Sequence, residues 1–559
     1  MLRRLALLLL LAALALACKH DATREQRASS QSPVPAPATL IAEGTLRDPD
    51  AVWGRLRKAG GRPLARMHDT AAAALLAWAG ADPGVAPLVA GEQAFQIVLG
   101  DSAEGVAFAI AMKLKDVDGV RAALVEGDTA RYRSEDVEGM MRLVPIEGAA
   151  PTVALAVSWA GYLVVASSAA DLATLGPYAA RTMPTKAPPA SAFELRMEPA
   201  ALGHIGHKAP DLATKATAAI AATARGVLPP EVDASAVAEC FTPGMRDTLA
   251  TAGDLAEARV NADADDAQLD VVATLVPKPG ENGARRRLSA MHPASASALL
   301  DAPRDALAAL FWSDTAESRA DDASTLGPCL GKALAPLLGP GGGPKLAEVL
   351  ASWAHGRGDW ETASFIAKPA LAGLVVRAPV VETTAMTTSV RGFVDLASQP
   401  ALADAIERLL PLRAGAVQTI DVPSVGKASV LMFPSHASPS RGTPDPPVVT
   451  TELAPAGLAW FVDAKEVDIA LGQAPQDLLG LAQPAAGFKT MASVGRAVGA
   501  LGADASFAAV VVPPGCCTAA APASAPLTFG WGRRAGNGRV TLAIGDEVLG
   551  QIVARVAAP

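Results

Sequence analysis

The clearest hydrophobic pattern lies near the C-terminal end of the chain. Leu527–Arg533 and Arg539–Ile544 are two apolar runs, and every other residue of the second run is apolar. The segment Ala535–Gly538 between them contains Asn-Gly, a strong hairpin signal because both residues tolerate positive φ. Apolar residues at helical spacing then predict a helix from about Asp546 to Ala554. The segment therefore predicts two antiparallel strands followed by an amphipathic helix.

The same order of hairpin and helix recurs in five earlier segments. In the clearest of them, Thr152–Ser158 and Tyr162–Ser167 flank a turn, and Ser168 with Asp171 predicts the N-terminal cap of the helix that follows. The other four copies run over Ala94–Val125, Leu255–Leu288, Trp360–Leu396 and Val449–Leu471, and the turn of the last is predicted at Pro455-Ala456-Gly457.

The six copies fall into two series of three. The first series begins at residues 94, 152 and 255 and the second at 360, 449 and 527, so that equivalent copies lie 266, 297 and 272 residues apart. A near-constant spacing predicts two tandem pseudo-repeats, residues 39–291 and 292–559. Each series follows one more apolar strand, Leu40–Leu46 or Ala306–Ser313, and a helical insert precedes each third copy, Pro199–Ala252 and about Gln476–Ala500.

These elements predict the fold class. Hairpins without strand–helix–strand crossovers form antiparallel sheets, because parallel neighbours need such crossovers. We therefore expect an α+β fold in which each repeat has an antiparallel sheet built from hairpin-plus-helix units, with helices packed on one face.

The N-terminus predicts export of the protein. Arg3 and Arg4 precede an unbroken apolar run of 13 residues, Leu5–Ala17. In a helix that rises ~1.5 Å per residue this run spans about 20 Å, which is too short for a hydrocarbon core of ~30 Å. The pattern therefore predicts a signal peptide over residues 1–17 instead of a transmembrane helix.

The end of that run, Ala15-Leu16-Ala17-Cys18, resembles the lipobox of bacterial lipoproteins, with Ala15 where Leu is usual. The resemblance implies that Cys18 becomes the first mature residue and carries acyl chains such as palmitate, which attach the protein to a membrane of the cell envelope. Residues 18–38 are polar and then rich in Pro and Ser, which predicts a disordered tether behind the anchor. Lys19, which is not Asp, favours the outer membrane by the same resemblance; which face of that membrane stays open, and plain secretion is the alternative.

Charge and composition narrow the partners. The 559 residues include 48 Lys and Arg and 56 Asp and Glu, a formal charge of −8. Because binding to nucleic acid depends on cations that neutralise phosphates, this balance argues against a nucleic-acid partner. Aromatic residues make up only 4% of the chain, which predicts a core of small aliphatic side chains.

Four cysteines follow Cys18, and they are Cys240, Cys329, Cys516 and Cys517. Four cysteines in an oxidising compartment allow three sets of disulfide bonds, and the sequence does not choose among them. A bond between the adjacent Cys516 and Cys517 needs an unusual eight-membered ring, so bonds to Cys240 and Cys329 are an equal alternative. Buried free thiols are a further alternative in a chain of this size.

Two short spacings resemble reactive sites, and neither has the surroundings that such a site needs. His204 and His207 could share one face of a helix as zinc ligands, but no other clustered His or Cys lies near them. Ser424 and Lys427 have the spacing of a nucleophile pair in penicillin-binding enzymes, whose partner motifs are missing here. We therefore predict no catalytic residue, no metal ligand and no cofactor-binding residue, and the lipid attachment residue Cys18 is the only site predicted.

Three further patterns lack the residues that their chemistry requires. The run Gly339–Lys345 resembles a phosphate loop, but two prolines remove backbone amides from it, so we interpret it as a linker. Gly530–Ala535 has dinucleotide-fingerprint spacing but lies within a predicted strand. Asn261–Asp266 has neither the glycine nor the final glutamate of a calcium loop, which predicts a solvated turn.

Three functions are compatible with these observations. The leading hypothesis is a lipid-anchored envelope protein without enzymatic activity, whose duplicated body binds or scaffolds an envelope protein partner. A second is a carrier or binder of an apolar ligand such as lipid, because a sheet rich in Ala and Val can line an apolar site. A third is a hydrolase whose active site is assembled from residues far apart in the sequence.

Overall fold

The structure, a computed structural model of the chain, describes most of the protein beyond the N-terminal segment. The described residues are 32–59, 67–80, 83–102, 105–126, 130–137, 139–146, 153–225, 228, 231–264, 268–339, 341–368, 371–397, 417–423, 425–433, 456–481, 487–512, 525–545 and 548–549. They divide into two compact units. Unit 1 comprises residues 1–205, 253–280 and 539–559, and unit 2 comprises residues 206–252 and 281–538.

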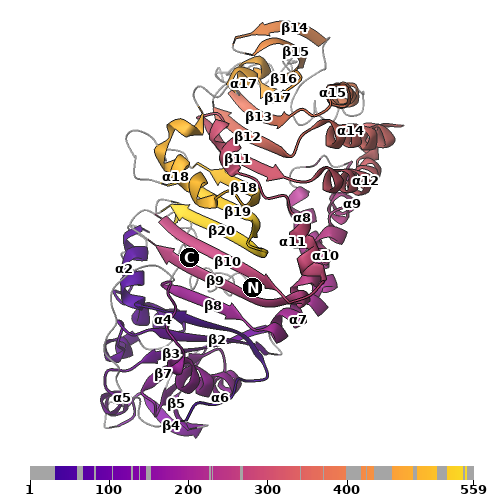
Figure 1. The fold of residues 1–559 in the computed structure, drawn as a ribbon. Coiled ribbons are helices and arrows are strands. Elements are labelled where there is room, and N and C mark those ends of the chain that lie inside the picture. Colours follow the sequence, from indigo (N-terminus) through magenta and orange to yellow (C-terminus); the bar gives the residue numbers. More distant parts are fainter. Residues whose placement is uncertain are drawn as a thin grey trace, which may run out of the picture. The chain divides into compact units, whose positions relative to one another are not determined.

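Unit 1 contains an antiparallel sheet whose strands lie one beside the next in Figure 1. In the order in which they pair, the strands are β4 (Tyr132–Val137), β5 (Met140–Pro145), β6 (Ala154–Ser158), β7 (Tyr162–Ala166), β3 (Gly105–Lys113), β2 (Phe95–Ser102), β1 (Leu40–Leu46), β8 (Phe193–Met197), β9 (Leu255–Ala264), β10 (Gln268–Pro277) and β20 (Asn537–Gly545), the last of which belongs to this unit from Arg539.

Helices cover both faces of this sheet. The helices are α2 (Pro49–Ala59), α4 (Ala71–Trp78), η1 (Pro83–Leu88), α5 (Val117–Leu124), α6 (Ala169–Pro177), η2 (Tyr178–Thr182), η3 (Met183–Thr185) and α7 (Pro199–His207). Ile97 of β2 packs with Trp53 of α2, whereas its neighbour Val98, which points to the opposite face, packs with Leu175 of α6. The sequence predicted helices on one face only, and in unit 1 this part of the prediction is wrong because β2 is apolar on both sides.

Unit 2 contains a second antiparallel sheet. Its strands, in the order in which they pair, are β14 (Val417–Val422), β15 (Gly426–Phe433), β16 (Ala456–Val462), β17 (Glu466–Gln473), β13 (Leu371–Pro379), β12 (Trp360–Lys368), β11 (Ala306–Ser313), β18 (Ala505–Val511) and β19 (Leu527–Arg534). The helices are α8 (Ala209–Ala224), α9 (Ala234–Glu239), α10 (Thr242–Ala250), α11 (Gly283–Ala290), η5 (Ala296–Asp301), α12 (Ala316–Ala333), α13 (Ala335–Leu338), α14 (Gly342–Gly356), α15 (Thr383–Ala397), α17 (Pro475–Leu481), η7 (Phe488–Thr490) and α18 (Ala492–Leu501).

The main hydrophobic core of unit 2 packs against one face of its sheet. Phe311, Ile366 and Val375 point into this core, where they pack with Leu478 of α17 and Val494 of α18. Each of these five side chains is almost fully buried. The helices η5, η7, α17 and α18 therefore cover this face.

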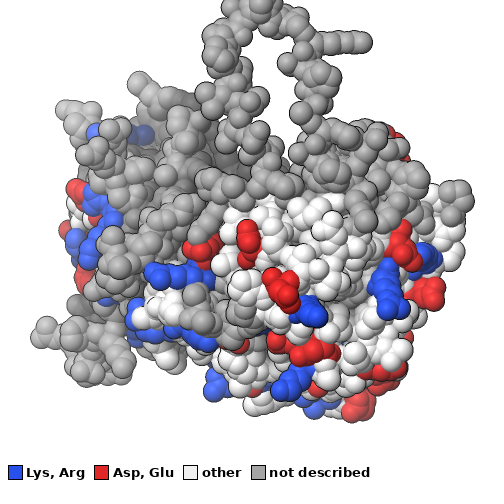
Figure 2. All heavy atoms as spheres, turned by 90° about the horizontal axis from the view of Figure 1, so that it is seen from above, with Lys and Arg blue, Asp and Glu red and all other residues white. Residues whose placement is uncertain are grey.

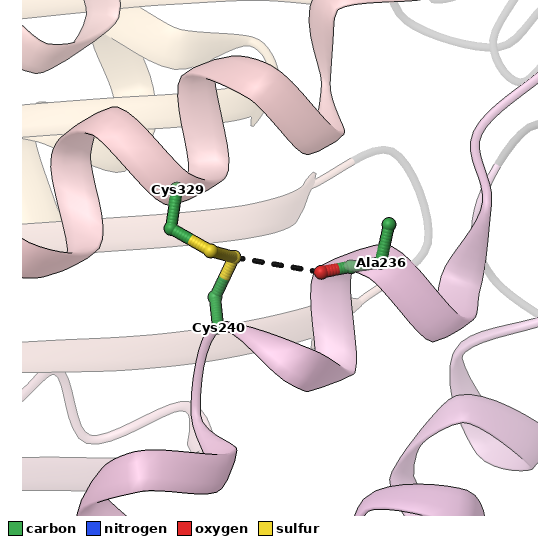
Figure 3. The surroundings of a disulfide bond; sticks show 3 residues. All are labelled: Ala236, Cys240 and Cys329. Carbon is green, nitrogen blue, oxygen red and sulfur yellow. Dashed lines mark hydrogen bonds between the residues drawn. A yellow bond between two sulfur atoms is a disulfide. The ribbon is translucent and has the colours of Figure 1, made fainter.

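A disulfide bond joins the helical insert α8–α10 to α12. Cys240 follows α9 and Cys329 lies in α12, and their Cα atoms are 5.7 Å apart (Figure 3). The sequence left the pairing open, and the structure selects this one. Cys516 and Cys517 lie outside the described residues.

The strands and helices of four predicted copies are confirmed. They are β2, β3 and α5; β6, β7 and α6; β9, β10 and α11; and β12, β13 and α15. The predicted cap of α6 is confirmed as well, because the Ser168 hydroxyl accepts a hydrogen bond from the Asp171 amide.

One predicted turn lies within its predicted segment, two residues before the Asn-Gly pair, and another is misplaced. In the last copy Ala535 and Gly536 have the positive φ angles, +50° and +82°, and Asn537 already begins β20. In the copy before it, Ala456 and Gly457 begin β16, and the turn lies instead at Asp463, whose side chain accepts hydrogen bonds from the amides of Lys465 and Glu466.

We expect the disulfide bond to stabilise unit 2 substantially. Cys240 and Cys329 are 89 residues apart in sequence, and closing a loop of that length removes enough entropy from the unfolded chain to contribute about 4 kcal/mol. The double variant Cys240→Ser/Cys329→Ser should therefore lower the free energy of unfolding of unit 2 by about that amount in urea titrations. Reduction of the unchanged protein should give the same loss and should not affect the variant. Equal unfolding midpoints for oxidised protein and variant would contradict the assignment.

Candidate functional site

The one site residue predicted from the sequence, Cys18, lies outside the described residues. So does Ser424 of the Ser-x-x-Lys pair. Lys427 lies on β15, opposite Asp421 of β14, and it is exposed. Lys427 therefore lies on a strand, and its predicted partner Ser424 is not described.

The two histidines of the His-x-x-His spacing lie on α7. His204 faces Asp101, with 3.5 Å between Nε2 and Oδ2. Across the part of the chain that the structure describes, no group of three or more His, Cys, Asp or Glu side chains lies close enough together to hold a metal ion. Nor does any described helix have the length and apolar character needed to cross a membrane.

The phosphate-loop-like and calcium-loop-like segments are parts of regular elements. Gly342 to Lys345 form the first turn of α14, and the Lys345 ammonium pairs with Asp395 at 2.7 Å, so the predicted linker is wrong at these residues. Asn261 and Asp263 lie on β9 instead of in a solvated turn, and the Asp263 carboxylate accepts a hydrogen bond from the Ala192 amide at 2.8 Å. Gly530 lies within β19, as predicted.

The feature of the structure that most resembles a binding site is the second face of the unit 2 sheet. Because side chains alternate along each strand, the residues next to Phe311, Ile366 and Val375 point away from the main core. The strand register places the following apolar side chains together on this opposite face: Ala308, Leu310 and Trp312 of β11; Ala363 and Phe365 of β12; Leu374 and Val376 of β13; Ile469 and Leu471 of β17; Phe507, Ala509 and Val511 of β18; Leu527, Phe529 and Trp531 of β19. We call this set the open apolar face.

Several of these side chains are exposed to solvent. Phe365 is 43% exposed, Leu471 47% and Val511 38%, although all three lie on strands in the interior of the sheet. Large contiguous apolar patches are uncommon on soluble proteins and mark sites of interaction. No strand pattern could have revealed this site, because an apolar residue on a central strand ordinarily predicts burial.

Two helices cover one end of the open apolar face. Met386 and Val390 of α15 pack with Ala378 and Val467 at the ends of β13 and β17, and Trp353 of α14 packs against the same cluster. Phe365, Leu374 and Leu471 lie beyond that end, and they belong to none of the apolar clusters that the helices of the described residues form with this sheet.

The close approach of α12 and α14 explains why they do not spread over the sheet. A Cβ atom at Gly331 of α12 would lie 2.5 Å from the carbonyl oxygen of Gly343 in α14, and one at Gly327 would lie 3.1 Å from the Cα of Ala347. Small residues at these positions let the two helix backbones touch. The helices therefore pack on each other, and α14 packs in turn on α15 through Val349 and Gly392.

A buried ionic network lies at the covered end of the open apolar face. The Arg357 guanidinium contacts Asp314 at 2.6 Å and Glu361 at 3.2 Å, and Arg319 donates to Asp314 at 3.1 Å. Glu361 points to the same side of β12 as Phe365 and accepts a hydrogen bond from the Trp353 indole at 3.1 Å. Burial raises the pKa of Glu361 above its ordinary value, against the opposing effect of Arg357.

The covered face of the same sheet holds a small polar pocket. Arg377 lines it together with Thr362, Ser364 and Asp301, and the Arg377 guanidinium forms two hydrogen bonds to Asp468, at 2.8 and 3.3 Å. The pocket has room for about one water molecule, so it suits a structural water better than a substrate.

Acidic and basic side chains are mixed on the face of the molecule that Figure 2 shows. In Figure 2, acidic and basic side chains lie on the same face of the molecule, around an area of uncharged residues.

Comparison with protein-family models, with curated proteins and with solved structures finds no match to this chain.

The ionic network makes a prediction about the pH dependence of stability. A carboxyl group whose pKa is higher in the folded protein than in the unfolded chain binds protons more tightly when folded, so its contribution to stability is lost as the pH rises from its ordinary value of 4.5. In Glu361→Gln this loss should be missing, and the stability of the unchanged protein relative to the variant should fall as the pH rises above 4.5.

Thermal unfolding from pH 4 to pH 8 measures this difference. Glu348→Gln, an exposed substitution on α14, is the control and should leave the pH profile unchanged. A difference between Glu361→Gln and the unchanged protein that stays constant with pH, or grows with it, would show that Glu361 does not titrate as described.

Proposed function

We propose that this chain is a lipid-anchored protein of the bacterial cell envelope that binds an apolar ligand on the open apolar face, and that it acts by binding instead of by catalysis. The observation that carries the proposal is the exposure of Phe365, Leu471 and Val511 on interior strands of the unit 2 sheet. Burying these side chains against a ligand would contribute about 25 cal/mol for each Å² of apolar area removed from water.

The composition of the open apolar face supports an apolar ligand. All fifteen side chains of the face are Ala, Val, Leu, Ile, Phe or Trp, and Glu361, a charged group on the same side of β12, is buried and accepts a hydrogen bond from Trp353. A ligand with polar groups would lose hydrogen bonds to water without gaining partners on such a surface. A hydrocarbon ligand loses nothing of this kind.

We also propose that the body of the protein is an internal duplication. The order β4-β5-β6-β7-β3-β2-β1-β8-β9 in unit 1 has the same pairing scheme as the order β14-β15-β16-β17-β13-β12-β11-β18-β19 in unit 2. Helices also recur at matching places, since α2 and α4 follow β1 as α12 and α14 follow β11, and α6 follows β7 as α17 follows β17. These correspondences support the spacing argument made from the sequence.

The duplication gives the open apolar face an internal comparison. In unit 1 the helices that follow β1 contribute Trp53, Leu56 and Leu76 to the core on one face of the sheet. In unit 2 the helices that follow β11 pack on each other, and the apolar face of the sheet is left exposed. The same strand order with a different placement of helices supports a ligand-binding role for unit 2.

Charged substitutions on the open apolar face should weaken binding of a fluorescent apolar probe. The probe is 8-anilinonaphthalene-1-sulfonate (ANS), added to Cys18→Ser protein purified without detergent. Phe365→Lys/Leu471→Lys should weaken the affinity for ANS by about tenfold or more, since burial of each replaced side chain contributes about 1.5 to 3 kcal/mol. Both residues are already exposed, so the variant should melt at the same temperature.

The matched control is Val381→Lys, which places a lysine at a residue of unit 2 that is 69% exposed and lies outside the sheet, between β13 and α15. It should bind ANS as the unchanged protein does. Failure of the unchanged protein to bind ANS, or equal binding by both lysine variants, would contradict the proposal. So would a dimer that covers this face and dissociates in Phe365→Lys/Leu471→Lys, because the face would then be an interface between copies.

The anchor is tested separately. In Cys18→Ser the acyl chains, each contributing about 0.8 kcal/mol per buried methylene, would have no attachment point. We expect this variant to move from the membrane pellet to the soluble fraction in cell fractionation, whereas Lys19→Arg, which keeps the cysteine, should stay in the pellet. A Cys18→Ser protein that remains in the pellet after washing with salt would contradict lipid anchoring.

A further inference from the structure

We infer that the free edge of β14 pairs with β14 of a second copy of this chain, so that the unit 2 sheets of the two copies join into one antiparallel sheet. This pairing does not depend on what binds to the open apolar face. It is supported by the unprotected edge of β14 and by the side chains that a two-fold axis would bring together there.

β14 is an edge strand with one free side. Among the described residues it pairs with β15 alone, and Figure 1 shows it at the edge of the unit 2 sheet. Val417, Gln418, Thr419 and Asp421 are all exposed. The backbone amides and carbonyls that point away from β15 are therefore open to water, and an extended polypeptide is the partner that can pair with them as a further strand.

The edge of β14 has none of the features that keep edge strands from pairing. Its register with β15 runs without a bulge, and its six residues include no proline and a single charged residue, Asp421. β4, which holds the same place in the pairing order of unit 1, is also six residues long and has Arg133, Glu135 and Asp136 exposed. Because charged side chains on an edge strand oppose pairing with another chain, β4 is protected and β14 is not.

A two-fold axis perpendicular to the sheet would place β14 antiparallel to its copy. Residues that face each other across antiparallel strands lie on the same side of the sheet, so this axis must pass beside one residue of β14 instead of between two residues. With the axis at Ile420, this residue faces its own copy, Gln418 faces Val422, and Thr419 faces Asp421.

The side chains of β14 favour this register over its neighbours. Asp421 lies opposite Lys427 within the chain, and the Thr419 hydroxyl of the copy could donate a hydrogen bond to it from the other side. Ile420, on the other side of the sheet, packs against the main core but is only half-buried, and contact with its copy would bury more of it. An axis at Asp421 would bring two carboxylates together, and an axis at Thr419 would place Asp421 against Val417.

A second copy fits this edge better than an unrelated peptide does. Any extended peptide could form the backbone hydrogen bonds, but the copy brings side chains that suit those of β14 without a clash of like charges. Six residues is also an ordinary length for a paired strand, about 5 to 6 residues. Because the two-fold pair uses the free edge of β14 in both copies, the assembly closes as a dimer and does not grow into a filament.

Sedimentation equilibrium of the Cys18→Ser protein without detergent, at several protein concentrations, measures this association. We expect an equilibrium between monomer and dimer. Thr419→Asp places a carboxylate opposite Asp421 at two places in the dimer, and it should raise the dissociation constant by about two- to thirtyfold. Thr419→Lys places an ammonium group there and should lower the dissociation constant by a similar factor. Thr419 is exposed, so both variants should melt at the same temperature as the unchanged residue allows.

The controls make the same changes on the other edge strand. Ser134→Asp and Ser134→Lys alter an exposed residue of β4, and neither should change the dissociation constant. Phe365→Lys/Leu471→Lys should also leave the dimer intact, which distinguishes it from a dimer formed through the open apolar face. Cys18→Ser protein that is monomeric at every concentration would overturn the inference, and so would a dimer on which Thr419→Asp and Thr419→Lys have the same effect. Neither result changes the ANS binding expected of the open apolar face.

Discussion

An antiparallel sheet whose strands are apolar on both sides must have both faces covered, and this requirement governs the structure described here. In unit 1 it is met from within the chain, by α2 and α4 on one face and by α6 on the other. In unit 2 it is met on one face, where η5, η7, α17 and α18 form the main core. On the other face α14 and α15 reach only one end. Exposing the remaining apolar side chains of this face to water costs free energy, and a bound apolar ligand would remove that cost. The proposed function follows from this argument.

The buried polar groups of unit 2 lie where the cover of the sheet ends. Arg357 and Arg319 form ion pairs with Asp314, and Arg357 also pairs with Glu361, which accepts a hydrogen bond from Trp353 at the end of the open apolar face that α14 covers. A buried ion pair of this kind adds little net stability, but removing one partner leaves an uncompensated charge and is strongly destabilising. The network therefore holds α14 in one position relative to β11 and β12, and it fixes where the uncovered part of the face begins.

The sequence predicted much of the local structure and little of the site. Alternating apolar residues located β2, β3, β6, β7, β9 and β10, and the spacing of Ser168 and Asp171 located the start of α6, because these signals depend on neighbours in the chain. The turn at Ala535 lies within its predicted segment but before the Asn-Gly pair, and the turn at Asp463 was misplaced, since several nearby residues could adopt the turn and the register of the strands selects among them. β4, β5, β14 and β15 were missed, because β4 and β14 carry mostly polar, exposed residues at the edges of their sheets.

The open apolar face could not be predicted in this way. Phe365 and Leu471 have the same local pattern as buried strand residues, and only the positions of α12, α14 and α15 decide that they are exposed. Those positions depend on contacts such as that of Gly331 with Gly343, which join residues of two helices and leave no periodic signal.

The most direct test of the account is to identify what occupies the open apolar face in the cell. Native protein, extracted from its own membranes and washed free of bulk lipid, would be analysed by mass spectrometry under conditions that preserve noncovalent complexes. The account predicts about one bound apolar ligand per protein, released by organic solvent and distinct from the chains attached to Cys18. Protein that carries no such ligand, with Phe365 and Leu471 nevertheless accessible to solvent, would contradict it.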